Sequence, residues 1–283
     1  MGMLHAGHLD LCHAALDAGA DVCVVTIFVN PTQFVVGEDL DVYPRDLEGD
    51  VAQLKVLAAA RRAKLVVFAP DVEELYPAGA PLRINPGPLG DVMEGVTRPG
   101  HFTGVCTVVN KLIMLVEPCA AYFGAKDYQQ VCVVRSMARD LFLPCAIVSV
   151  PTAREPNGLA MSSRNLYLSE IERDGAGAIY AGLRAAVRLW KEQGVVDAAK
   201  LVREGERVML SSTWRQDMDT PGGGGMPPAP SVVSRVDYLE IRAADTLIPL
   251  ESLEGIPPAG AVMLAEAIVG AKGARLLDNI LFE

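Results

Sequence analysis

The chain has 283 residues, of which 51% are hydrophobic and 21% charged, and its formal net charge is -10 at pH 7. This length suits one large domain or two modest ones with a substantial hydrophobic core. The acidic balance argues against a nucleic-acid-binding protein, whose footprint is normally basic. Because the apolar stretches are shorter than the roughly 20 residues of a membrane-spanning helix and no secretory signal opens the chain, we expect a cytoplasmic protein without nucleic-acid or membrane partners.

The first eight residues, Met1 to His8, read MGMLHAGH and precede a helix-like apolar run at Leu9–Leu16. A helix N-terminus carries free N–H groups and a partial positive charge, so it attracts phosphate. Gly7 lets a ligand approach the backbone, and the imidazoles of His5 and His8 can donate hydrogen bonds to charge that develops on a phosphoryl group. The stretch indicates an enzyme acting at the α-phosphate of a nucleotide, with a histidine pair of no special role and a metal clip as alternatives.

The segments that follow alternate between strand-like and helix-like patterns. The apolar run Val22–Val29 predicts a buried parallel strand, and Pro44–Arg61 has helical spacing with an acidic start and a basic end. We also expect strands at Leu65–Ala69, Ala120–Phe123 and Cys145–Val150, helices at Phe102–Val116 and Gln129–Leu141, and a Pro- and Gly-rich excursion at Pro77–Gly90. This alternation predicts an α/β domain over residues 1–151 with a doubly wound parallel sheet, in which ligands bind beyond the carboxyl ends of the strands.

The pattern changes after Pro151. Helical spacing at Glu170–Glu192 and Asp197–Leu210 is followed by Thr220–Pro230, which holds four consecutive glycines and four prolines. That composition buries too little surface to offset its ordering entropy, so we expect a flexible insertion there. Three strand-like runs end the chain, at Arg235–Ile241, Ala261–Val269 and Arg275–Leu281. This pattern predicts a smaller α+β lid domain over residues 152–283.

Polar residues follow two of the predicted strands. Gln33 offers both donors and acceptors at a strand end, which suits a hydroxy-acid substrate. At the second turn Gly124 permits close backbone approach, Lys126 can supply a point charge to phosphate, and Asp127 can accept from ribose hydroxyls. Gln130 lies one helical turn further on, where a second ligand can bind. The plainer interpretations are a loop glutamine without a role and a solvated Lys–Asp pair with a capping role.

A third polar turn joins the two predicted domains. Ser162, Ser163 and Arg164 place two hydroxyls and a guanidinium in a row, which suits a clamp for a leaving pyrophosphate. An ordinary Ser-Ser-Arg turn is the alternative, but three such patterns at strand ends support one another. Two further histidines stay outside this set: we expect His101 to cap a helix, with a substrate contact as the alternative, and His13 to be structural or to face solvent.

The six cysteines form no Cys-x-x-Cys pair and no cluster with histidine. Their apolar neighbours indicate buried free thiols in a reducing compartment. We therefore expect no metal site built from protein ligands.

Taken in order, the motifs resemble those of the pantothenate synthetase family, also called pantoate–β-alanine ligases. The resemblance runs through MGMLHAGH, IFVNPTQF, EDLDVYPRDL, LVVFAPDVEELYP, GPLGDVMEGVTRPGHFTGVCTVVNKL, YFGAKDYQQ, NGLAMSSRNLYLS, VDYLEIRAADTL and ARLLDNI. It implies a Rossmann-like fold of the HxGH nucleotidyltransferase type. It also implies a reaction in which ATP, pantoate and β-alanine give pantothenate, AMP and pyrophosphate through a pantoyl adenylate.

The resemblance also implies roles for individual residues. The catalytic set would be His5, His8, Lys126, Ser162, Ser163 and Arg164, with His8 as the proton donor. The ATP site would comprise Met1, Gly2, His5, Gly7, His8, Gly124, Ala125, Lys126, Asp127, Ala153, Met161, Ser162, Ser163 and Arg164. Gln33 and Gln130 would bind pantoate, with Asn30 nearby. Mg²⁺ would enter with ATP and be held mainly by phosphate oxygens, and the family implies a homodimer.

The chain departs from the family's pattern in several places. Members usually carry a strand before the HxGH motif, which here begins at Met1. Its absence would leave neighbouring strand edges unpaired and the phosphate turn untethered, so we expect lower stability and activity than in a version with that strand. The insertion Thr220–Pro230 is also unusual, whereas Ala125 and Pro156, which replace commoner family residues, remove no group that the chemistry needs.

Three other functions fit parts of the pattern. A related nucleotidyltransferase would act on a phosphorylated substrate, but Gln33 and Gln130 and the lack of a second basic phosphate pocket argue against it. A non-catalytic remnant is favoured by the missing strand and opposed by the intact Lys126 and Ser162–Arg164. An aminoacyl-tRNA synthetase has little support, because the chain is acidic and lacks an anticodon-binding appendage.

Overall fold

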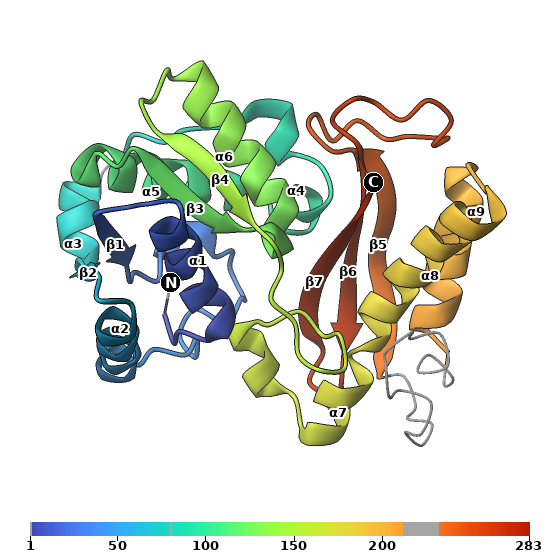
Figure 1. Ribbon diagram of the computed structural model, residues 1–283, viewed down its shortest axis with the longest axis horizontal. Coiled ribbons are helices and arrows are strands. Elements are labelled where there is room, and N and C mark those ends of the chain that lie inside the picture. The colour runs from blue at the N-terminus through green and yellow to red at the C-terminus, as the bar shows by residue number, and fades with distance from the viewer. Residues whose placement is uncertain (1, 80, 212–231) are drawn as a thin grey trace. The chain divides into compact units, whose positions relative to one another are not determined.

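The computed structural model describes residues 2–79, 81–211 and 232–283. These group into two compact units: unit 1 comprises Met1–Ala125 and Gln129–Pro151, and unit 2 comprises Lys126–Tyr128 and Thr152–Glu283. Figure 1 labels their helices and strands. Met1, which we predict in the ATP site, and the predicted insertion at Thr220–Pro230 lie outside the described residues.

Unit 1 alternates strands and helices along the chain. Its strands are β1 (Val22–Thr26), β2 (Lys64–Phe68), β3 (Ala120–Gly124) and β4 (Ala146–Val150). Its helices are α1 (Ala6–Asp17), α2 (Leu47–Arg61), α3 (Val72–Leu75), α4 (Glu94–Thr97), α5 (His101–Val116) and α6 (Tyr128–Asp140), with short 3-10 turns η1 (Pro31–Gln33), η2 (Pro77–Gly79) and η3 (Gly87–Gly90). The 3-10 turn η4 (Ala125–Asp127) belongs to unit 1 only at Ala125, and the first residue of α6, Tyr128, groups with unit 2. The predicted α/β class is confirmed.

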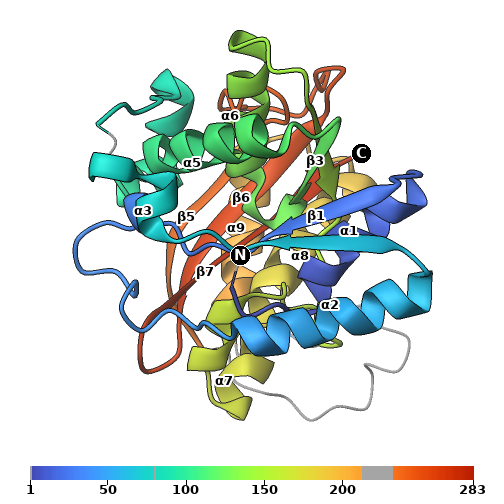
Figure 2. The ribbon, with the colours of Figure 1, turned by 90° about the vertical axis from the view of Figure 1, so that its left-hand side faces the viewer.

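The parallel strands of unit 1 form two separate pairs. β1 pairs with β2 in register from Val22–Lys64 to Thr26–Phe68, and β3 pairs with β4 from Ala120–Ala146 to Gly124–Val150. Among the described residues no ladder joins one pair to the other, so the single doubly wound sheet that we predicted is wrong at this point. Helix α1 connects the two pairs instead, because it lies close to β1, β3 and β4. Figure 2 shows the β1–β2 pair beside α2.

Apolar clusters fix the helices of unit 1 to these strands. One cluster joins α1, β1 and α2 and consists of Leu4, Cys12, Val25, Ile27, Leu54 and Leu57. Another joins α5 and α6 and consists of Phe102, Val105, Cys106, Val133, Val134 and Met137. Burying each large apolar side chain stabilises the fold by roughly 1.5–3 kcal/mol. Helix α1, which carries most of the HxGH motif, is therefore held firmly against the strands.

Unit 2 contains an antiparallel sheet of order β5-β6-β7. The strands are β5 (Val233–Ala243), β6 (Ala261–Val269) and β7 (Ala274–Phe282), close to the predicted runs, and the helices are α7 (Glu170–Gly175), α8 (Ala178–Gln193) and α9 (Ala198–Met209), preceded by the 3-10 turn η5 (Ser163–Tyr167). The helix predicted over Glu170–Glu192 is two helices. Gly177 is the N-cap of α8, and glycine is a poor former of helix interiors, which explains the interruption.

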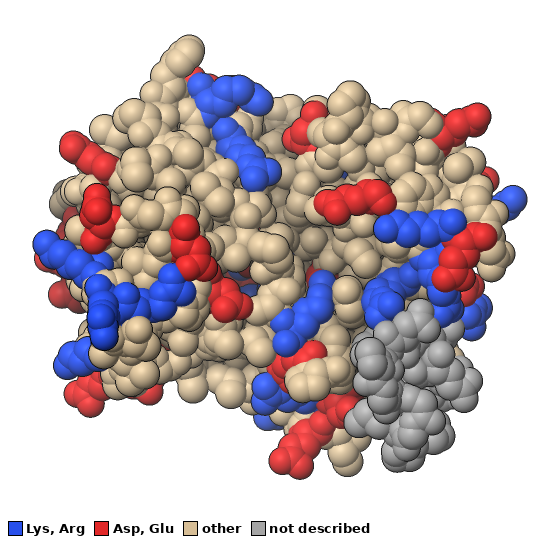
Figure 3. All heavy atoms as spheres, in the orientation of Figure 1, with Lys and Arg blue, Asp and Glu red and all other residues tan. Residues whose placement is uncertain are grey.

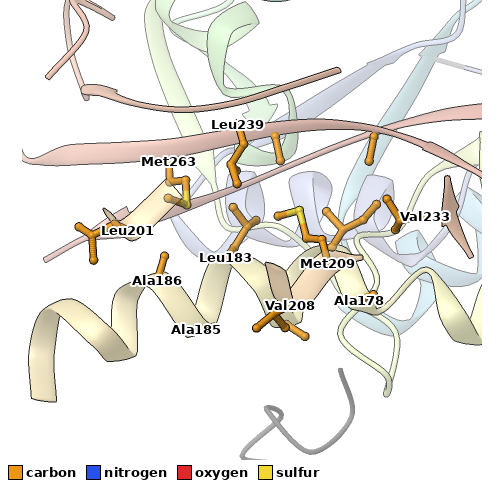
Figure 4. Packing of buried hydrophobic residues seen from close by; sticks show 14 of the residues in the cluster. Ala178, Leu183, Ala185, Ala186, Leu201, Val208, Met209, Val233, Leu239 and Met263 are labelled. Atoms are coloured by element: carbon orange, nitrogen blue, oxygen red, sulfur yellow. The ribbon is translucent and has the colours of Figure 1, made fainter. Parts of the chain in front are cut away.

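The core of unit 2 lies between its sheet and the helices α8 and α9. Figure 4 shows Leu183, Met209, Leu239 and Met263 packed together in it, and all four belong to one buried cluster. The two helices cross closely at Gly182, where an added Cβ would lie 2.4 Å from the carbonyl oxygen of Gly205. Dense packing of this kind gives β7 a rigid support.

The surface and the cysteines bear on the expected class of protein. On the face shown in Figure 3, the described acidic and basic side chains are intermixed. No helix among the described residues is long and apolar enough to cross a membrane. All six cysteines are free: Cys12, Cys106, Cys132 and Cys145 are buried as predicted, but Cys119 is exposed and Cys23 is partly exposed.

Candidate active site

His5 and His8 lie together at the start of α1. His5 is the N-cap residue, and its backbone N–H donates to Nδ1 of His8 at 3.2 Å. The two imidazole rings are stacked, with centroids 3.9 Å apart and planes inclined by 29°. Gly7 lies between them in the first turn of the helix. The structure thus places two half-buried imidazoles at the helix end whose N–H groups attract anions.

Asp50, which the motifs do not single out, anchors the segment before α1. Its carboxylate accepts hydrogen bonds from the backbone N–H groups of Met3 at 3.0 Å and Leu4 at 2.5 Å. Asp50 is only 1% exposed and shares the buried face of α2 with Leu54 and Leu57. A buried carboxylate is costly unless it is hydrogen-bonded. An acidic residue at the spacing of an apolar helix face is therefore the sequence signal for this anchor.

The turn after β1 is organised by Asn30, which is 3% exposed. Its Oδ1 accepts from Thr32 Oγ1 at 2.9 Å and from the Tyr76 hydroxyl at 2.7 Å. Its Nδ2 donates to Gln33 Oε1 at 3.0 Å and to the carbonyl oxygen of Gly104 at 3.2 Å. Asn30 therefore orients the side chain of Gln33, which is half-buried.

The segment Asn30–Gln33, called the Asn30 turn below, is held in place by a buried ion cluster. Arg98 pairs with Glu38 at 2.5 Å and with Glu94 at 2.7 Å, and the three side chains are 7%, 14% and 9% exposed. Nη2 of Arg98 also donates to the carbonyl oxygen of Gln33 at 3.2 Å. Burial strengthens such charge-assisted bonds relative to exposed ones. The cluster fixes the backbone from which the Gln33 side chain projects.

His101 belongs to the same support and is not the cap that we predicted. The N-cap of α5 is Gly100, whereas Nδ1 of His101 lies 2.7 Å from the carbonyl oxygen of Gln33 and Nε2 lies 3.2 Å from Nη1 of Arg98. Burial lowers the pKa of His101 below its ordinary value, with Glu94 opposing the shift and Arg98 adding to it. A neutral ring that donates from Nδ1 and accepts at Nε2 satisfies both contacts.

Gln129 and Gln130 open α6 after β3 and have different surroundings. Gln129 is 3% exposed and donates from Nε2 to the carbonyl oxygens of Leu89 at 3.1 Å and Val92 at 2.8 Å, while its Oε1 accepts from the N–H of Glu94. Gln130 is half-buried. Gln129 thus fixes the start of α6 to the segment that carries α4, and Gln130 is the member of the pair left partly accessible.

The Lys126 turn (Lys126–Tyr128) groups with unit 2. Nζ of Lys126 pairs with Oδ1 of Asp127 at 3.0 Å, and these side chains are 19% and 42% exposed. The Tyr128 hydroxyl donates to the carbonyl oxygen of Ala244 at 3.0 Å. Just before the turn, a Cβ added at Gly124 would meet no atom within 4 Å. No described protein atom therefore occupies the side of Gly124 where a Cβ would lie, and its contact with a ligand stays a prediction.

The Arg154 hairpin (Ala153–Met161) leads to the Ser-Ser-Arg motif. The N–H of Met161 donates to the carbonyl oxygen of Ala153 at 2.9 Å. Ser162 then caps η5, its hydroxyl accepting from the backbone N–H of Arg164 at 3.3 Å. Ser163 is buried, and Ser162 and Arg164 are half-buried. The motif is therefore an ordered turn whose first hydroxyl serves the backbone.

The structure divides the described site residues between the two units. Unit 1 contains Gly2, His5, Gly7, His8, Asn30, Gln33, Gly124, Ala125 and Gln130, and unit 2 contains Lys126, Asp127, Ala153, Met161, Ser162, Ser163 and Arg164. In unit 1 the segment before α1 lies beside the segment that follows β1, because a Cβ added at Gly2 would lie 3.1 Å from Cγ2 of Val29. Among the described residues no group of three His, Cys, Asp or Glu side chains could hold a metal ion.

Comparison with known proteins identifies the family. A family model described as Pantoate-beta-alanine ligase matches residues 1–281. The chain belongs to the pantoate–β-alanine ligase family. It is 43% identical over 281 residues to the pantothenate synthetase of Mycobacterium sp. (strain KMS), an alignment that covers 99% of this chain and 78% of that protein. The resemblance carried by the motifs is confirmed.

Two solved structures of pantoate–β-alanine ligases are similar to this one. The pantothenate synthetase of Thermus thermophilus is 43% identical with a TM-score of 0.82, over 99% of this chain and 90% of that one. The ligase of Francisella tularensis, crystallised with beta-gamma ATP and beta-alanine, is 30% identical with a TM-score of 0.71, over 100% of this chain and 87% of that one. The roles given to individual residues by the family stay predictions.

Proposed function

We propose that this chain catalyses the ATP-dependent condensation of pantoate with β-alanine to pantothenate, through a pantoyl adenylate and with release of AMP and pyrophosphate. Family membership and the curated relatives support the condensation, and the Francisella tularensis structure with an ATP compound and β-alanine supports two of the substrates. The observation that carries the proposal is the stacked His5–His8 pair at the N-terminus of α1.

In the first step a carboxylate oxygen of pantoate attacks the α-phosphorus of ATP. The bond from phosphorus to the bridging oxygen breaks, and pyrophosphate leaves with the electron pair. The reaction needs no nucleophile from the protein, so the protein's contribution is positioning and charge stabilisation. His5 and His8 stabilise the negative charge at the phosphate, with His8 as the proton donor, and the accessible amides of Gln33 and Gln130 bind pantoate.

Residues of unit 2, together with Gly124 and Ala125 of unit 1, bind the nucleotide. Gly124, Ala125, Lys126 and Asp127 hold the ribose and phosphates, Ala153 lies near adenine, and Met161, Ser162, Ser163 and Arg164 close over the triphosphate. The N-terminal segment, including Gly2 and Gly7, lines the same nucleotide. Mg²⁺ would arrive with ATP and would be held mainly by phosphate oxygens.

In the second step the amine of β-alanine attacks the acyl carbon of the adenylate. The acyl–oxygen bond breaks, AMP leaves with the electron pair, and the nitrogen loses a proton as the amide forms.

We extend the proposal to the organisation of the protein: a Rossmann-like domain of the HxGH nucleotidyltransferase type over residues 1–151, a lid domain over 152–283, a homodimer and a cytoplasmic location. Size-exclusion chromatography with light scattering tests the dimer.

The reaction itself is tested by measuring AMP release with ATP and Mg²⁺. Pantoate alone, β-alanine alone and both together form the three arms, and each is paired with ATP–pyrophosphate exchange. We expect steady AMP release only with both substrates and exchange with pantoate alone. AMP formation with a phosphorylated acceptor would favour a related nucleotidyltransferase, and ATP binding without turnover would mark a non-catalytic remnant.

A further inference from the structure

Two adjacent polar residues in the middle of β7, Asp278 and Asn279, are buried, at 4% and 6% exposed. Successive side chains of a strand point to opposite faces of the sheet. Asp278 therefore shares a face with Leu276 and Phe282, which belong to the core beneath α8 and α9, whereas Asn279 points to the other face. A carboxylate among core residues is costly unless charged and polar partners surround it, so the partners of this pair reveal its role.

Asp278 holds the Arg154 hairpin. Its two carboxylate oxygens accept from Nη1 and Nη2 of Arg154 at 2.6 and 2.8 Å, a bidentate pair. The guanidinium carbon lies 3.6 Å from the ring centroid of Tyr180 on α8, and Nη1 also donates to the carbonyl oxygen of Gly158 at 3.0 Å. Bidentate geometry fixes orientation as well as distance. Asp278 thereby fixes Arg154, whose backbone forms an antiparallel bridge with Ala160 just before the Ser-Ser-Arg motif.

Asn279 holds the Lys126 turn. Its Nδ2 donates to the carbonyl oxygen of Lys126 at 2.8 Å, across a sequence separation of 153 residues. Its backbone N–H donates to Oδ1 of Asp278 at 2.7 Å, and its carbonyl oxygen accepts from Nη2 of Arg154 at 3.3 Å. Fixing a backbone carbonyl fixes the peptide plane next to the Cα, which directs the Lys126 side chain. The Lys126 turn and the Arg154 hairpin are thus connected through two neighbouring residues of one strand.

We propose that Asp278 and Asn279 are positioning residues of the nucleotide site, which hold the Lys126 turn and the Arg154 hairpin in a fixed arrangement so that both can bind the phosphates of one ATP. This inference rests on the proposed function, because it takes Lys126 and Ser162–Arg164 as ligands of the triphosphate. The proposed role requires no contact of either residue with the nucleotide. Their effect is transmitted through the carbonyl oxygen of Lys126 and the guanidinium of Arg154.

The test uses the isosteric variant Asn279→Asp in the full chain, because a carboxylate cannot donate to the Lys126 carbonyl. We expect the KM for ATP to rise about tenfold, as for the loss of one hydrogen bond that aligns a charged group, with the KM values for pantoate and β-alanine unchanged. Asn279→Ala, which removes the donor without adding charge, is expected to raise the KM for ATP in the same way. Asp278→Asn weakens the hold on Arg154 and adds a second measurement.

The matched control is Asp197→Ala. Asp197 caps α9 in the same unit, accepting from the N–H of Lys200 at 2.8 Å, far along the chain from the Lys126 turn and the Arg154 hairpin. Its loss lowers the unfolding midpoint without altering the KM for ATP. A double-mutant cycle supplies an independent measurement: in a Lys126→Ala background, Asn279→Asp should change the Kd for ATP far less than in the native chain, because the two act on one ligand contact.

The outcomes separate the two proposals. If the native chain releases no AMP with all three substrates, the proposed function fails, whatever the variants do. If the native chain is active but Asn279→Asp keeps its KM for ATP and only lowers the unfolding midpoint, the pair is structural and the positioning role is overturned. Two other results would overturn the positioning role as well. One is an equal rise of the KM values for ATP, pantoate and β-alanine in Asn279→Asp, and the other is full additivity of the effects of Asn279→Asp and Lys126→Ala on the Kd for ATP.

Discussion

At the scale of single residues, the strongest chemical demand falls on Lys126. Its side chain is 19% exposed, and it forms an ion pair with its neighbour Asp127, which is 42% exposed. A pair that water reaches in this way contributes little to stability, about 0–1 kcal/mol. A cation directed at developing phosphate charge, in contrast, acts in the transition state, where one such group is worth about 10²–10³ in rate. The two roles can therefore be separated by one substitution.

Lys126→Ala is expected to reduce pantoate-dependent ATP–pyrophosphate exchange by about 10²–10³-fold while leaving the unfolding midpoint close to that of the native chain. Isotope exchange and thermal unfolding monitored by circular dichroism measure the two quantities. Lys191→Ala is the control, because Lys191 is an exposed lysine of α8 that lies over the ring of Trp190. Near-native exchange in Lys126→Ala would remove this residue from the mechanism.

His101 couples the Asn30 turn to pH. Burial lowers its pKa in the folded protein from an ordinary value of 6.5, so below that pH the unfolded chain binds more protons than the folded one. The free energy of unfolding then rises with pH between the lowered pKa and 6.5 and falls on acidification. Protonation also converts Nε2, which faces Arg98, from an acceptor into a donor, so acid weakens the support of Gln33.

We therefore expect His101→Gln to show a shallower loss of unfolding free energy between neutral and mildly acidic pH than the native chain. Urea titrations over this range give both slopes, and the KM for pantoate measured at each pH reports on Gln33. His13→Gln controls for general titration effects, since His13 lies on α1 near Arg61 and outside this cluster. Parallel slopes for the native chain and His101→Gln would show that His101 does not titrate in this way.

At the scale of elements, the position of the Asn30 turn depends on how closely α5 approaches it. A Cβ added at Gly104 would lie 2.2 Å from the carbonyl oxygen of Thr32 and 2.7 Å from the Cα of Gln33. Both neighbours are backbone atoms, so no flexible side chain can move aside. The side-chain amide of Asn30 donates a hydrogen bond to the carbonyl oxygen of Gly104. The helix and the turn can therefore separate only if the Gln33 backbone moves.

Gly104→Ala is expected to lower the free energy of unfolding by about 1–3 kcal/mol, as for other overpacked positions, and to raise the KM for pantoate more than the KM for ATP. Chemical denaturation and steady-state kinetics measure these effects. Gly124→Ala is the matched comparison, because its Cβ would meet no protein atom within 4 Å. Gly124→Ala should keep the free energy of unfolding and weaken ATP binding. A loss of stability in Gly124→Ala, or a weaker ATP binding without loss of stability in Gly104→Ala, would contradict the roles given to the two glycines.

Local patterns predict elements better than they predict contacts between elements. The run Ala261–Val269 is β6 as predicted, and Phe102–Val116 differs from α5 by one residue at its start. Periodicity reports which face of an element is apolar, but it does not say which partner that face meets. The contacts of Asp50 with Met3 and Leu4, and of Asn279 with Lys126, join residues far apart in sequence. The spacing of Asp50 on its helix marks it as a buried acid, but the partners of both anchors follow only from the assembled fold.

At the scale of the whole molecule, motif order specified the family, while the pairing of strands required the structure. Residue types at strand ends indicate chemistry because phosphate and carboxylate recognition permits few side chains. Strand pairing depends instead on backbone ladders, to which the type of side chain is a poor guide, and the expected single sheet is two parallel pairs among the described residues. The contacts of His101 also required the structure. Its position before a helix predicted a cap, but its ring lies against the carbonyl oxygen of Gln33.

The proposed nucleotide site also predicts how the stability of the entire chain responds to ligand. A ligand that binds only the folded state stabilises it by about 2.7 kcal/mol at a concentration about 100 times its Kd. We expect ATP with Mg²⁺ to raise the unfolding midpoint, and chelation by EDTA to remove most of that rise, because Mg²⁺ neutralises the phosphates that the protein binds. Scanning calorimetry with ATP, with and without EDTA, measures both effects. If Mg²⁺ binds only together with ATP, EDTA without ATP should leave the midpoint unchanged, and a large fall would point instead to a structural ion.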